Sequence, residues 1–344
     1  MEGIKNRYTA LQIVGSPTSQ FFFDLSILYA KDVVAPQEFK LLFAVIYPDG
    51  NWSISPSIDE KSEKIGLSEF ISKLSDVDVV VPHLFCDKGL TTIRILFEDT
   101  LGIPLVGSSG YTLKIAQDKQ MTKRIGQEEN VGLPKSFVVR SVEEAIVKVD
   151  MMNFPVIVKP NTSDNSEGLT LVRESRDLEK AIYEALQFCT KIIVEEFIDG
   201  REIRAAILEI DNEFELLPAI EYHVNHSNPI RKKSDKLLFD VEGKLVAQSD
   251  KIEIPATCPA ILNTTLETQL KKTMITMHRA MGCRDFSMYD FRICKDTEQS
   301  FLLEAGLFWS FSETSMISKM IKTTTFDLNS ITSKIWQQAL KRKS

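Results

Sequence analysis

The sequence predicts an α/β (α+β) protein made of several packed units, and the alternation of strand-like and helix-like segments carries that prediction. Apolar, β-rich runs at 10–14, 41–47 and 77–85 are separated by segments of helical character, including LSEFISKL and TTIRILFEDTL. This order predicts a small parallel sheet with covering helices. The stretch 135–197 then has the order strand, helix, strand, strand, helix, strand, which indicates a second compact unit.

The remaining chain predicts a larger third unit. Long β-rich runs (REIRAAILEI, EFELLPAIEY, FSMYDFRI and SFLLEA) alternate with helical patterns near 265–281 and 327–341. The glycine- and serine-rich run GIPLVGSSG interrupts the pattern before YTLKIAQDKQMTKRIGQEE, which we expect to be a charged helix. We therefore place the three units at 1–110, 111–199 and 200–344.

Composition and charge argue against several classes of protein. The 344 residues are 43% hydrophobic and 26% charged, which is typical of a globular chain rather than a disordered one. A formal net charge of -7, with Lys and Arg scattered, offers no basic surface for nucleic acid. No apolar run reaches about 18 to 20 residues, and the opening MEGIKNRYTA lacks a secretory apolar core, so we expect a cytoplasmic protein without a membrane partner.

The cysteines and histidines predict neither disulfides nor zinc. Five widely spaced cysteines include no CxxC pair, so reduced and mostly buried thiols are the simplest interpretation. His223 and His226 form the only close histidine pair in the sequence, and no cysteine lies near them to complete a zinc site. The motif GxxxxGK[ST] and a strand-linked GxGxxG are also missing, which argues against a P-loop kinase and a dinucleotide oxidoreductase.

A lysine followed by a polar loop is the first candidate for a chemical site. In FPVIVKPNTSDNSEGLTLV an apolar strand ends at Lys159 and leads through a loop rich in Ser, Asn and Gly into a second strand. The ammonium of Lys159 suits a phosphate, and Ser166 and Gly168 leave backbone amides open to phosphate oxygens. Taken alone, the pattern fits a hairpin with a solvated lysine equally well.

The second candidate follows in KIIVEEFIDGREIRAAI, where a strand, a turn at 199–200 and another strand succeed each other. Backbone groups from Glu195 to Ile198 are suited to an adenine edge, and Glu202 at the start of the next strand is a candidate for ribose hydroxyls. The competing interpretation is that Glu195 and Glu196 only occupy a solvated strand face, where most glutamates lie.

Two carboxylates late in the chain form the third candidate. Asp290 in SMYDFRI and Glu304 in FLLEAGL lie at the ends of apolar runs, and paired strands would bring them together as oxygen ligands for Mg²⁺. Strand side chains alternate, so Met288, Asp290 and Arg292 share one face, and Arg292 can lie near the metal and a developing oxyanion. For either acid alone, an ordinary surface role is the more common outcome.

Taken together, DK at 118–119, VKP at 158–160, EEFIDGRE, DFR and LLEAG resemble the ATP-grasp superfamily and, within it, the D-alanine–D-alanine ligase group. The resemblance covers roughly residues 100 to 321. It implies a three-unit ATP-grasp fold with the nucleotide cleft between the central and C-terminal units, an N-terminal substrate domain, a homodimer, and ATP and Mg²⁺ as cofactors. The implied roles are α- and β-phosphate binding for Lys119 and Lys159, the phosphate loop for Ser166 and Gly168, adenine contact for Glu195 and Ile198, ribose binding for Glu202, γ-phosphate binding for Lys236, and magnesium binding for Asp290 and Glu304.

The chain departs from that group at several positions. Gly306 stands where the group's metal motif ends in Asn, and Met288 stands where the group has an arginine two residues before the metal aspartate. Arg292 is a candidate substitute from the same strand face. The group's N-terminal glutamate and its HGxxGE-like histidine have no convincing counterpart in VGSPTSQFFFDLS or PHLFCDKGLTT. These differences argue against D-alanine as the substrate.

The departures have a pattern that resembles a narrower family, the ligases that convert mycosporine-glycine into disubstituted mycosporine-like amino acids such as shinorine or porphyra-334. This resemblance covers nearly the whole chain and implies serine or threonine as the amino acid that is joined. The segments that carry it are VGSPTSQFFFDLSILYAKD, PHLFCDKGLTTIRILFEDTLGIPLVG, KPNTSDNSEGLTLV, PIRKKSDKL, MGCRDFSMYDFRI and LLEAGLFWSFSETSMISKM.

The resemblance implies a reaction in which a substrate oxygen takes the γ-phosphoryl group of ATP and an amine then displaces phosphate. Lys236 and Arg292 would stabilise charge during the transfer, and Ser315 in ETSMIS would bind the amino acid's carboxylate, although a simple helix cap explains Ser315 equally well. The intermediate must be kept from water, so we expect 161–168 and 224–250 to close over ATP. Two alternatives stay open: a dipeptide ligase of the D-alanine–D-alanine type, and a nucleotide-binding regulator without turnover.

Overall fold

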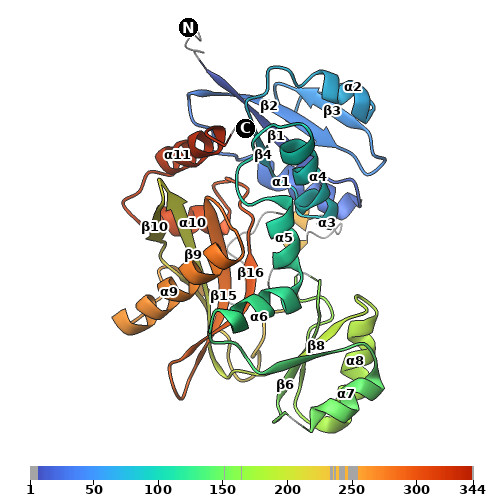
Figure 1. The fold of residues 1–344 in the computed structure, drawn as a ribbon, viewed down its shortest axis with the longest axis vertical. Helices are drawn as coiled ribbons and strands as arrows, with labels where there is room; N and C mark the ends of the chain where they lie inside the picture. The colour runs from blue at the N-terminus through green and yellow to red at the C-terminus, as the bar shows by residue number, and fades with distance from the viewer. Residues whose placement is uncertain are drawn as a thin grey trace.

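The computed structural model consists of three β-sheets with helices packed around them (Figure 1). A separate two-stranded hairpin contains β12 (Leu238–Phe239) and β13 (Leu245–Val246). No helix within the described residues combines the length and the apolar content needed to cross a bilayer. The structure describes residues 7–150, 152–163, 165–232, 235, 238–239, 245–246 and 255–342.

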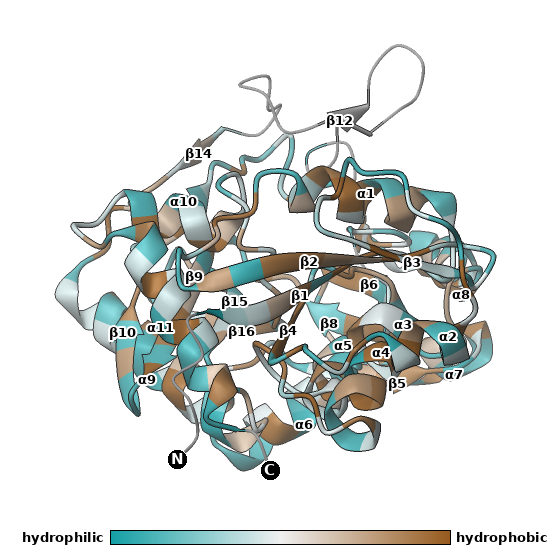
Figure 2. Ribbon diagram, turned by 90° about the horizontal axis from the view of Figure 1, so that it is seen from above, coloured by the Kyte–Doolittle hydropathy of each residue, from teal (hydrophilic) through white to brown (hydrophobic). Residues whose placement is uncertain are grey.

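The N-terminal sheet has the strand order β3-β2-β1-β4, and β1 pairs in parallel with both β2 and β4. These three strands are the apolar runs of the sequence, so the predicted parallel sheet is confirmed; β4 and most of β2 are brown, hydrophobic, in Figure 2. The antiparallel edge strand β3 was not predicted, because four residues carry little periodic signal. The elements are β1 (Tyr8–Gly15), α1 (Gln20–Ala30), β2 (Phe39–Ile46), β3 (Trp52–Ser55), α2 (Leu67–Ser72), β4 (Val79–Pro82), α3 (Asp87–Leu90), α4 (Thr92–Ile95) and the π-helical η1 (Leu96–Thr100).

Two helices, not the single charged helix that the sequence predicts, lead into the central unit. These are α5 (Gly110–Gln117) and α6 (Lys119–Glu128), and the chain turns between them at Asp118. Asp118 has an extended backbone, and its carboxylate accepts a hydrogen bond from the backbone N–H of Met121, as an N-cap does. The break makes Lys119 the first residue of α6, at the edge of the cleft described below.

The central sheet has the order β5-β8-β6-β7, and all its pairings are antiparallel. Each strand and helix predicted from the sequence is present in the predicted order. The side chains of α7 and α8 pack with the apolar strand residues into a core of their own, and in Figure 1 both helices lie on one side of the sheet. The elements are β5 (Ser136–Val139), α7 (Val142–Val149), β6 (Val156–Pro160), β7 (Thr170–Val172), the 3-10 turn η2 (Ser175–Asp177), α8 (Leu178–Leu186) and β8 (Ile192–Glu196).

The C-terminal sheet has the order β14-β11-β9-β15-β16, with β10 also paired to β9. Because side chains alternate along each strand, one face of this sheet is mainly apolar and the other carries charged residues. Ile203, Ala205 and Phe291 belong to the core that packs on α9, whereas the opposite face presents charged side chains to the cleft. The elements are β9 (Gly200–Ile210), β10 (Glu213–Leu216), β11 (Ile220–Tyr222), β14 (Ala256–Thr257), α9 (Thr264–Ala280), β15 (Phe286–Cys294), β16 (Ser300–Gly306), α10 (Met316–Lys322) and α11 (Leu328–Leu340).

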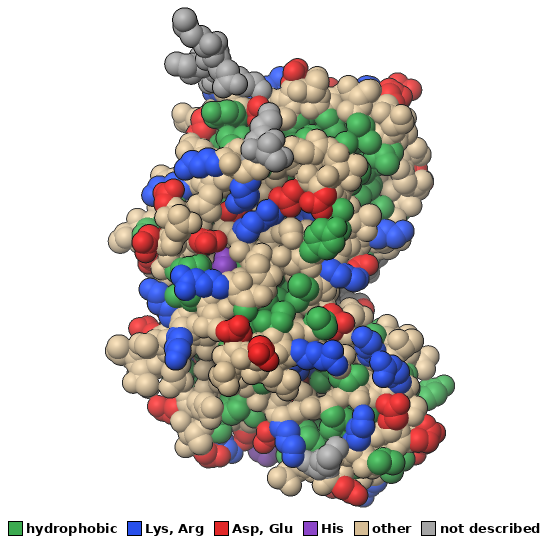
Figure 3. All heavy atoms as spheres, in the orientation of Figure 1, with side chains coloured by type: hydrophobic (Ala, Val, Ile, Leu, Met, Phe, Trp, Pro, Cys, Tyr) green, Lys and Arg blue, Asp and Glu red, His purple; other side chains and the backbone are tan. Residues whose placement is uncertain are grey.

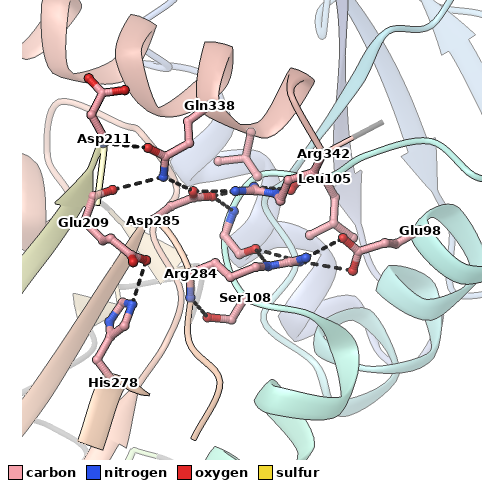
Figure 4. A network of polar contacts seen from close by, with 12 residues as sticks. Glu98, Leu105, Ser108, Glu209, Asp211, His278, Arg284, Asp285, Gln338 and Arg342 are labelled. Carbon is pink, nitrogen blue, oxygen red and sulfur yellow. Dashed lines mark hydrogen bonds and ion pairs between the residues drawn. The ribbon is translucent and has the colours of Figure 1, made fainter. Parts of the chain in front are cut away.

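The N-terminal and C-terminal sheets share one core and one polar network (Figure 4). Trp336 of α11 packs edge-on against Phe39 of β2, with ring centroids 5.2 Å apart. The buried carboxylate of Asp285 accepts hydrogen bonds from the Gly107 backbone N–H and from two nitrogens of Arg342, each at 2.7 Å. The connection from the N-terminal sheet to α5 is therefore fixed to the start of β15.

Acidic and basic side chains are interspersed over the face of the molecule shown in Figure 3. No large area of a single sign is visible there. The expectation that the chain lacks a nucleic-acid partner stays a prediction.

Candidate functional site

A small cavity of about 90 Å³ lies between the central and C-terminal sheets. Its walls come from α6, β6, the loop before β7, the end of β8, and the charged face of β9, β15 and β16. Most of the residues predicted to bind nucleotide or metal meet at this cavity. They are Lys119, Lys159, Ser166, Glu195, Ile198, Glu202, Asp290 and Glu304, and Arg292, predicted to stabilise charge during the transfer, also lines the cavity.

A buried ion cluster holds Lys159 in place. Its Nζ lies 2.5 Å from one carboxylate oxygen of Glu195, and Lys123 Nζ lies 2.9 Å from the other. Burial opposes the charged form of Glu195, but the two ammonium groups outweigh it and lower the pKa of Glu195 to about 2. Burial also lowers the pKa of Lys159, an effect that Glu195 opposes. The side chain of Glu195 therefore positions two lysines.

Lys119 joins the two sides of the cavity. Its Nζ donates a hydrogen bond to the Ser163 backbone oxygen at 2.6 Å and lies 3.5 Å from Glu304 Oε2. The lysine side chain is buried, with 8% of its surface exposed, whereas Glu304 keeps 35%. A cation from the central half thus faces a carboxylate from the C-terminal half.

The loop between β6 and β7 has a backbone that few residues other than glycine adopt. Asn165, Ser166 and Gly168 all have positive φ, at 53°, 60° and 70°. A Cβ on Gly168 would lie 2.7 Å from Pro160 Cγ, so this position needs glycine for both conformation and space. Ser166 Oγ donates a hydrogen bond to the Arg231 backbone oxygen at 2.8 Å. The loop therefore reaches across to the C-terminal half.

The carboxylate of Glu202 is held by two guanidinium groups. Arg231 donates to one oxygen, and Arg292 donates to the other at 3.0 Å. Arg292 also donates to the backbone oxygens of Gly200, at 3.2 Å, and Pro229. Burial lowers the pKa of Arg292, and Glu202 opposes that effect. Arg292 is thus engaged at the Glu202 end of the small cavity.

Three charged residues form a row across the C-terminal sheet. Arg204 of β9 is opposite Asp290 of β15, which is opposite Glu304 of β16. Arg204 Nε and Nη2 donate to the two oxygens of Asp290 at 2.6 and 2.7 Å. Burial opposes the charge on Arg204, but Asp290 outweighs it, and the pKa of Arg204 is raised well above its usual value.

The donor set of this row fits a magnesium ion. Asp290 and Glu304 offer carboxylate oxygens from adjacent strands at the edge of the small cavity. Magnesium is usually held in proteins by one or two carboxylates and completes its shell with water and nucleotide phosphates. Two carboxylates beside a cavity with lysines on its opposite wall meet that requirement.

A second cavity, of about 380 Å³, adjoins the first and shares Lys119, Asp290 and Glu304 as walls. Met288 and Gly306, which are opposite each other on β15 and β16, lie along its sheet side. Aromatic and aliphatic side chains from α1, the segment after β4, the segment after β16 and the start of α10 contribute to the remaining wall. They include Phe22, Leu25, Tyr29, Phe85, Leu307, Phe308, Trp309 and Met316.

Ser315 lies on the large cavity rather than the small one. It is the N-cap of α10, since its hydroxyl accepts a hydrogen bond from the Ser318 backbone N–H. Trp309 Nε1 also donates to this hydroxyl, at 2.9 Å. The helix-cap interpretation of Ser315 is confirmed, and its binding of a carboxylate stays a prediction.

The chain matches the sequence model of the family described as D-ala D-ala ligase C-terminus over residues 125–337, which is more than half of its length. The chain belongs to this family. Its mixed α/β fold matches the ATP-grasp structures of the family's ligases. The VanG D-Ala:D-Ser ligase from Enterococcus faecalis superposes with a TM-score of 0.80 at 21% identity, covering 97% of this chain and 99% of that one.

Two relatives show how much of the chain is similar in sequence to other proteins. The uncharacterized protein y4sG of Sinorhizobium fredii is 34% identical over 205 residues, which are 59% of this chain and 56% of that protein. The chain thus spans little more than half of that relative's length. A protein named D-alanine–D-alanine ligase from Natranaerobius thermophilus is 26% identical over 283 residues, covering 79% of this chain and 72% of the relative.

The structure places the predicted residues unevenly between the two cavities. Gly168 lies in the loop beside the small cavity, and Ser315 lies on the large one. Lys236 lies outside the described residues, as do 233–234, 237, 240–244 and 247–250 of the segment 224–250, for which closure over a nucleotide is predicted. The sequence analysis did not identify Lys123, Arg204 or Arg231. Side chains alternate along β9, so Arg204 lies on the same face as Glu202, and this pattern could have identified Arg204 from the sequence.

Proposed function

We propose that this chain is an ATP-dependent ligase that phosphorylates an acid-like oxygen of a small substrate and joins the adjacent carbon to the amino group of an amino acid. One observation carries the proposal. Lys119, Lys159, Asp290 and Glu304 line a single cavity, and that cavity adjoins a larger one able to hold the substrates. The names of the relatives, which are ligases in the family to which this chain belongs, support the same reaction class.

In this proposal the small cavity holds the nucleotide, with adenine near Ile198 and the end of β8. Lys119 and Lys159 bind the α- and β-phosphates, and the loop containing Ser166 and Gly168 covers them. Lys236 reaches the γ-phosphate. Magnesium held by Asp290 and Glu304 would neutralise charge on the phosphate oxygens.

We further propose mycosporine-glycine as the substrate in the large cavity. The cavity wall is mainly aromatic and aliphatic, and at about 380 Å³ it is suited to a ring rather than to a single alanine. Met288 and Gly306, which stand where the D-alanine–D-alanine ligase group has Arg and Asn, remove two polar groups from that wall. Serine or threonine is the proposed amino acid, with its carboxylate near Ser315.

The chemistry follows from the ring ketone of mycosporine-glycine, which is conjugated to a nitrogen and behaves as a vinylogous acid. Its oxygen attacks the γ-phosphorus, so an oxygen–phosphorus bond forms and ADP leaves with the bridging oxygen. The amino nitrogen then adds to the carbon that carries the phosphate. That carbon–oxygen bond breaks, phosphate leaves, and the nitrogen loses a proton.

A dipeptide ligase of the D-alanine–D-alanine type is the second candidate. It is favoured by the family match and by the names of the relatives, which support it better than they support the mycosporine substrate. Both candidates use the same nucleotide cavity and differ in the first substrate. With ATP, magnesium and amino acids alone, only the second candidate would make a product.

Mass-spectrometric detection of products separates the two candidates. The purified chain is incubated with ATP, Mg²⁺ and a mixture of amino acids that includes D-alanine, with and without mycosporine-glycine. The main proposal expects ADP, phosphate and a disubstituted product only in the complete mixture. A dipeptide formed without mycosporine-glycine would establish the second candidate. A chain that binds nucleotide but makes neither product would instead be a regulator without turnover.

A further inference from the structure

We propose that Arg204 binds the acid-like oxygen of the substrate in the large cavity and holds it next to Asp290 and Glu304. Arg204 is thereby assigned as the substrate-orienting arginine of the chain, in place of Arg292. The inference rests on the proposed ligase function, because it names the group that presents the substrate to the nucleotide.

The position of Arg204 brings it into contact with both Asp290 and the large cavity. It lies in β9, in register with Asp290, and its side chain forms part of the wall of the large cavity with 18% of its surface exposed. Its bonds to Asp290 use Nε and Nη2. Within the described part of the chain, Nη1 makes no hydrogen bond. One edge of the guanidinium is therefore fixed by Asp290 while Nη1 is left for a ligand.

The surroundings keep this guanidinium charged and oriented. Tyr222 of β11 lies beside it, with the ring centroid 5.7 Å from Arg204 Cζ. Arg231 stacks closer on the same ring, at 3.6 Å, so two cations meet beside Tyr222 on the wall of the large cavity. A substrate oxygen that carries negative charge would be attracted to these two guanidinium groups, which lie on the wall beside Asp290 and Glu304.

Arg292 does not offer the same access. Its Nη groups donate to Glu202 and to the backbone oxygens of Gly200 and Pro229. It lines the small cavity and is absent from the described wall of the large one. Two arginines on one sheet face thus divide the cleft, with Arg292 on the side proposed for ribose and Arg204 on the side proposed for the substrate.

A lysine in place of Arg204 keeps the charge but loses the planar fork that bonds Asp290 and a ligand at once. For Arg204→Lys we expect the KM for mycosporine-glycine to rise about tenfold, which corresponds to about 1.4 kcal/mol. The KM for ATP should stay within about threefold, because Lys119 and Lys159 are untouched. Arg201→Lys is the matched control, since Arg201 lies on the same strand and forks onto Glu221 at 2.8 and 2.6 Å outside both cavities. That variant should leave both KM values unchanged.

Calorimetric titration gives a readout that does not depend on turnover. Wild type, Arg204→Lys and Arg201→Lys are each titrated with Mg²⁺ and a non-hydrolysable ATP analogue, and then with mycosporine-glycine or D-alanine. The inference expects Arg204→Lys to bind the nucleotide like wild type and the acid-like ligand about tenfold more weakly. Normal binding of that ligand, or a loss confined to nucleotide and Mg²⁺, would overturn it. The latter result would make Arg204 a support for Asp290 alone.

The titration also separates this inference from the proposed function. If wild type binds mycosporine-glycine or D-alanine without forming any product, the ligase proposal fails, and the Arg204→Lys titration with that ligand still decides the role of Arg204. If wild type forms product and Arg204→Lys matches it in both KM values, the ligase proposal stands and the Arg204 inference fails. A wild-type chain that binds neither ligand overturns both.

Discussion

The two cavities that meet at Asp290 and Glu304 differ in size and in chemistry. The small one, of about 90 Å³, is walled by lysines, acids and a glycine-containing loop from the central and C-terminal units. The large one, of about 380 Å³, is walled mainly by aromatic and aliphatic side chains, including Phe22, Leu25, Tyr29 and Phe85 of the N-terminal unit. Charged groups in the small cavity are paired across its walls, as the cluster of Lys123, Lys159 and Glu195 shows.

This contrast shows where the chain follows its family and where it departs. In the account given above, the small cavity binds a nucleotide, so its charges must match phosphates and a divalent ion whatever the second substrate is. In the same proposal the large cavity binds that second substrate. Met288 and Gly306, the two departures in the metal motif, both lie on the large cavity. Substitutions in the two cavities should therefore have separable effects.

The largest effect is expected where the cavities meet. Asp290→Asn or Glu304→Gln removes a carboxylate proposed to hold magnesium, so product formation should fall by at least about 100-fold while nucleotide binding persists. Product yield by mass spectrometry and binding of a fluorescent ATP analogue measure the two quantities. Asp199→Asn, which breaks an exposed pair with Lys295, is the matched control and should retain activity. Full activity in both cavity variants would contradict the metal assignment.

A large loss of stability is expected within the small cavity alone. Glu195→Gln leaves two ammonium groups buried without their carboxylate, which should lower the free energy of unfolding by about 3 kcal/mol at pH 7. Urea unfolding measures this loss, and Glu184→Gln on the exposed side of α8 should change little.

The stabilisation by Glu195 should depend on pH, and the lowered pKa of Glu195 determines in which direction. The pKa of Glu195 is about 2 in the folded chain against an ordinary value of 4.5, so its stabilisation is present above pH 4.5 and is lost as the pH falls toward 2. The difference in unfolding free energy between wild type and Glu195→Gln should shrink over that interval. A difference that stays constant down to pH 3 would argue against the buried ion cluster.

A selective effect is expected within the large cavity. Met288→Arg places a guanidinium in an apolar wall opposite Gly306, and it restores the residue that the D-alanine–D-alanine ligase group has there. We expect kcat/KM for mycosporine-glycine to fall by at least about tenfold with little change in nucleotide affinity. Met288→Leu conserves volume and should stay near wild type. If Met288→Arg lowered kcat/KM for mycosporine-glycine and the affinity for nucleotide by the same factor, the two cavities would not act independently.

The smallest effect is expected in the loop over the small cavity. Gly168→Ala places a Cβ 2.7 Å from Pro160 Cγ at a position whose φ is positive. The loop must therefore shift, and the KM for ATP should rise about fivefold. Gly50→Ala is the control for φ alone, because Gly50 also has positive φ, at 83°, and nothing lies within 4 Å of its Cβ position. Steady-state kinetics at saturating second substrate test both. Equal KM values in the two variants would remove the steric argument.

Local pattern was sufficient to predict the order of elements in the central unit and the parallel strands of the N-terminal sheet. It was also sufficient to select Lys159, Asp290 and Glu304, because each follows a run of apolar residues in the sequence. Alternation could place Arg204 on the face of Glu202, but not opposite Asp290, because that pairing depends on the register between strands that are far apart in sequence. The break at Asp118 was missed because the polar residues on both sides continue a helical pattern, and only the cap geometry separates α5 from α6.

Anomalous diffraction from crystals grown with Mn²⁺ and a non-hydrolysable ATP analogue tests the central claim most directly. The account predicts a manganese peak about 2 to 2.2 Å from carboxylate oxygens of Asp290 and Glu304, with the phosphate chain between that ion and Lys119 and Lys159. A peak at other residues, or a nucleotide outside the cavity that these four side chains line, would contradict it.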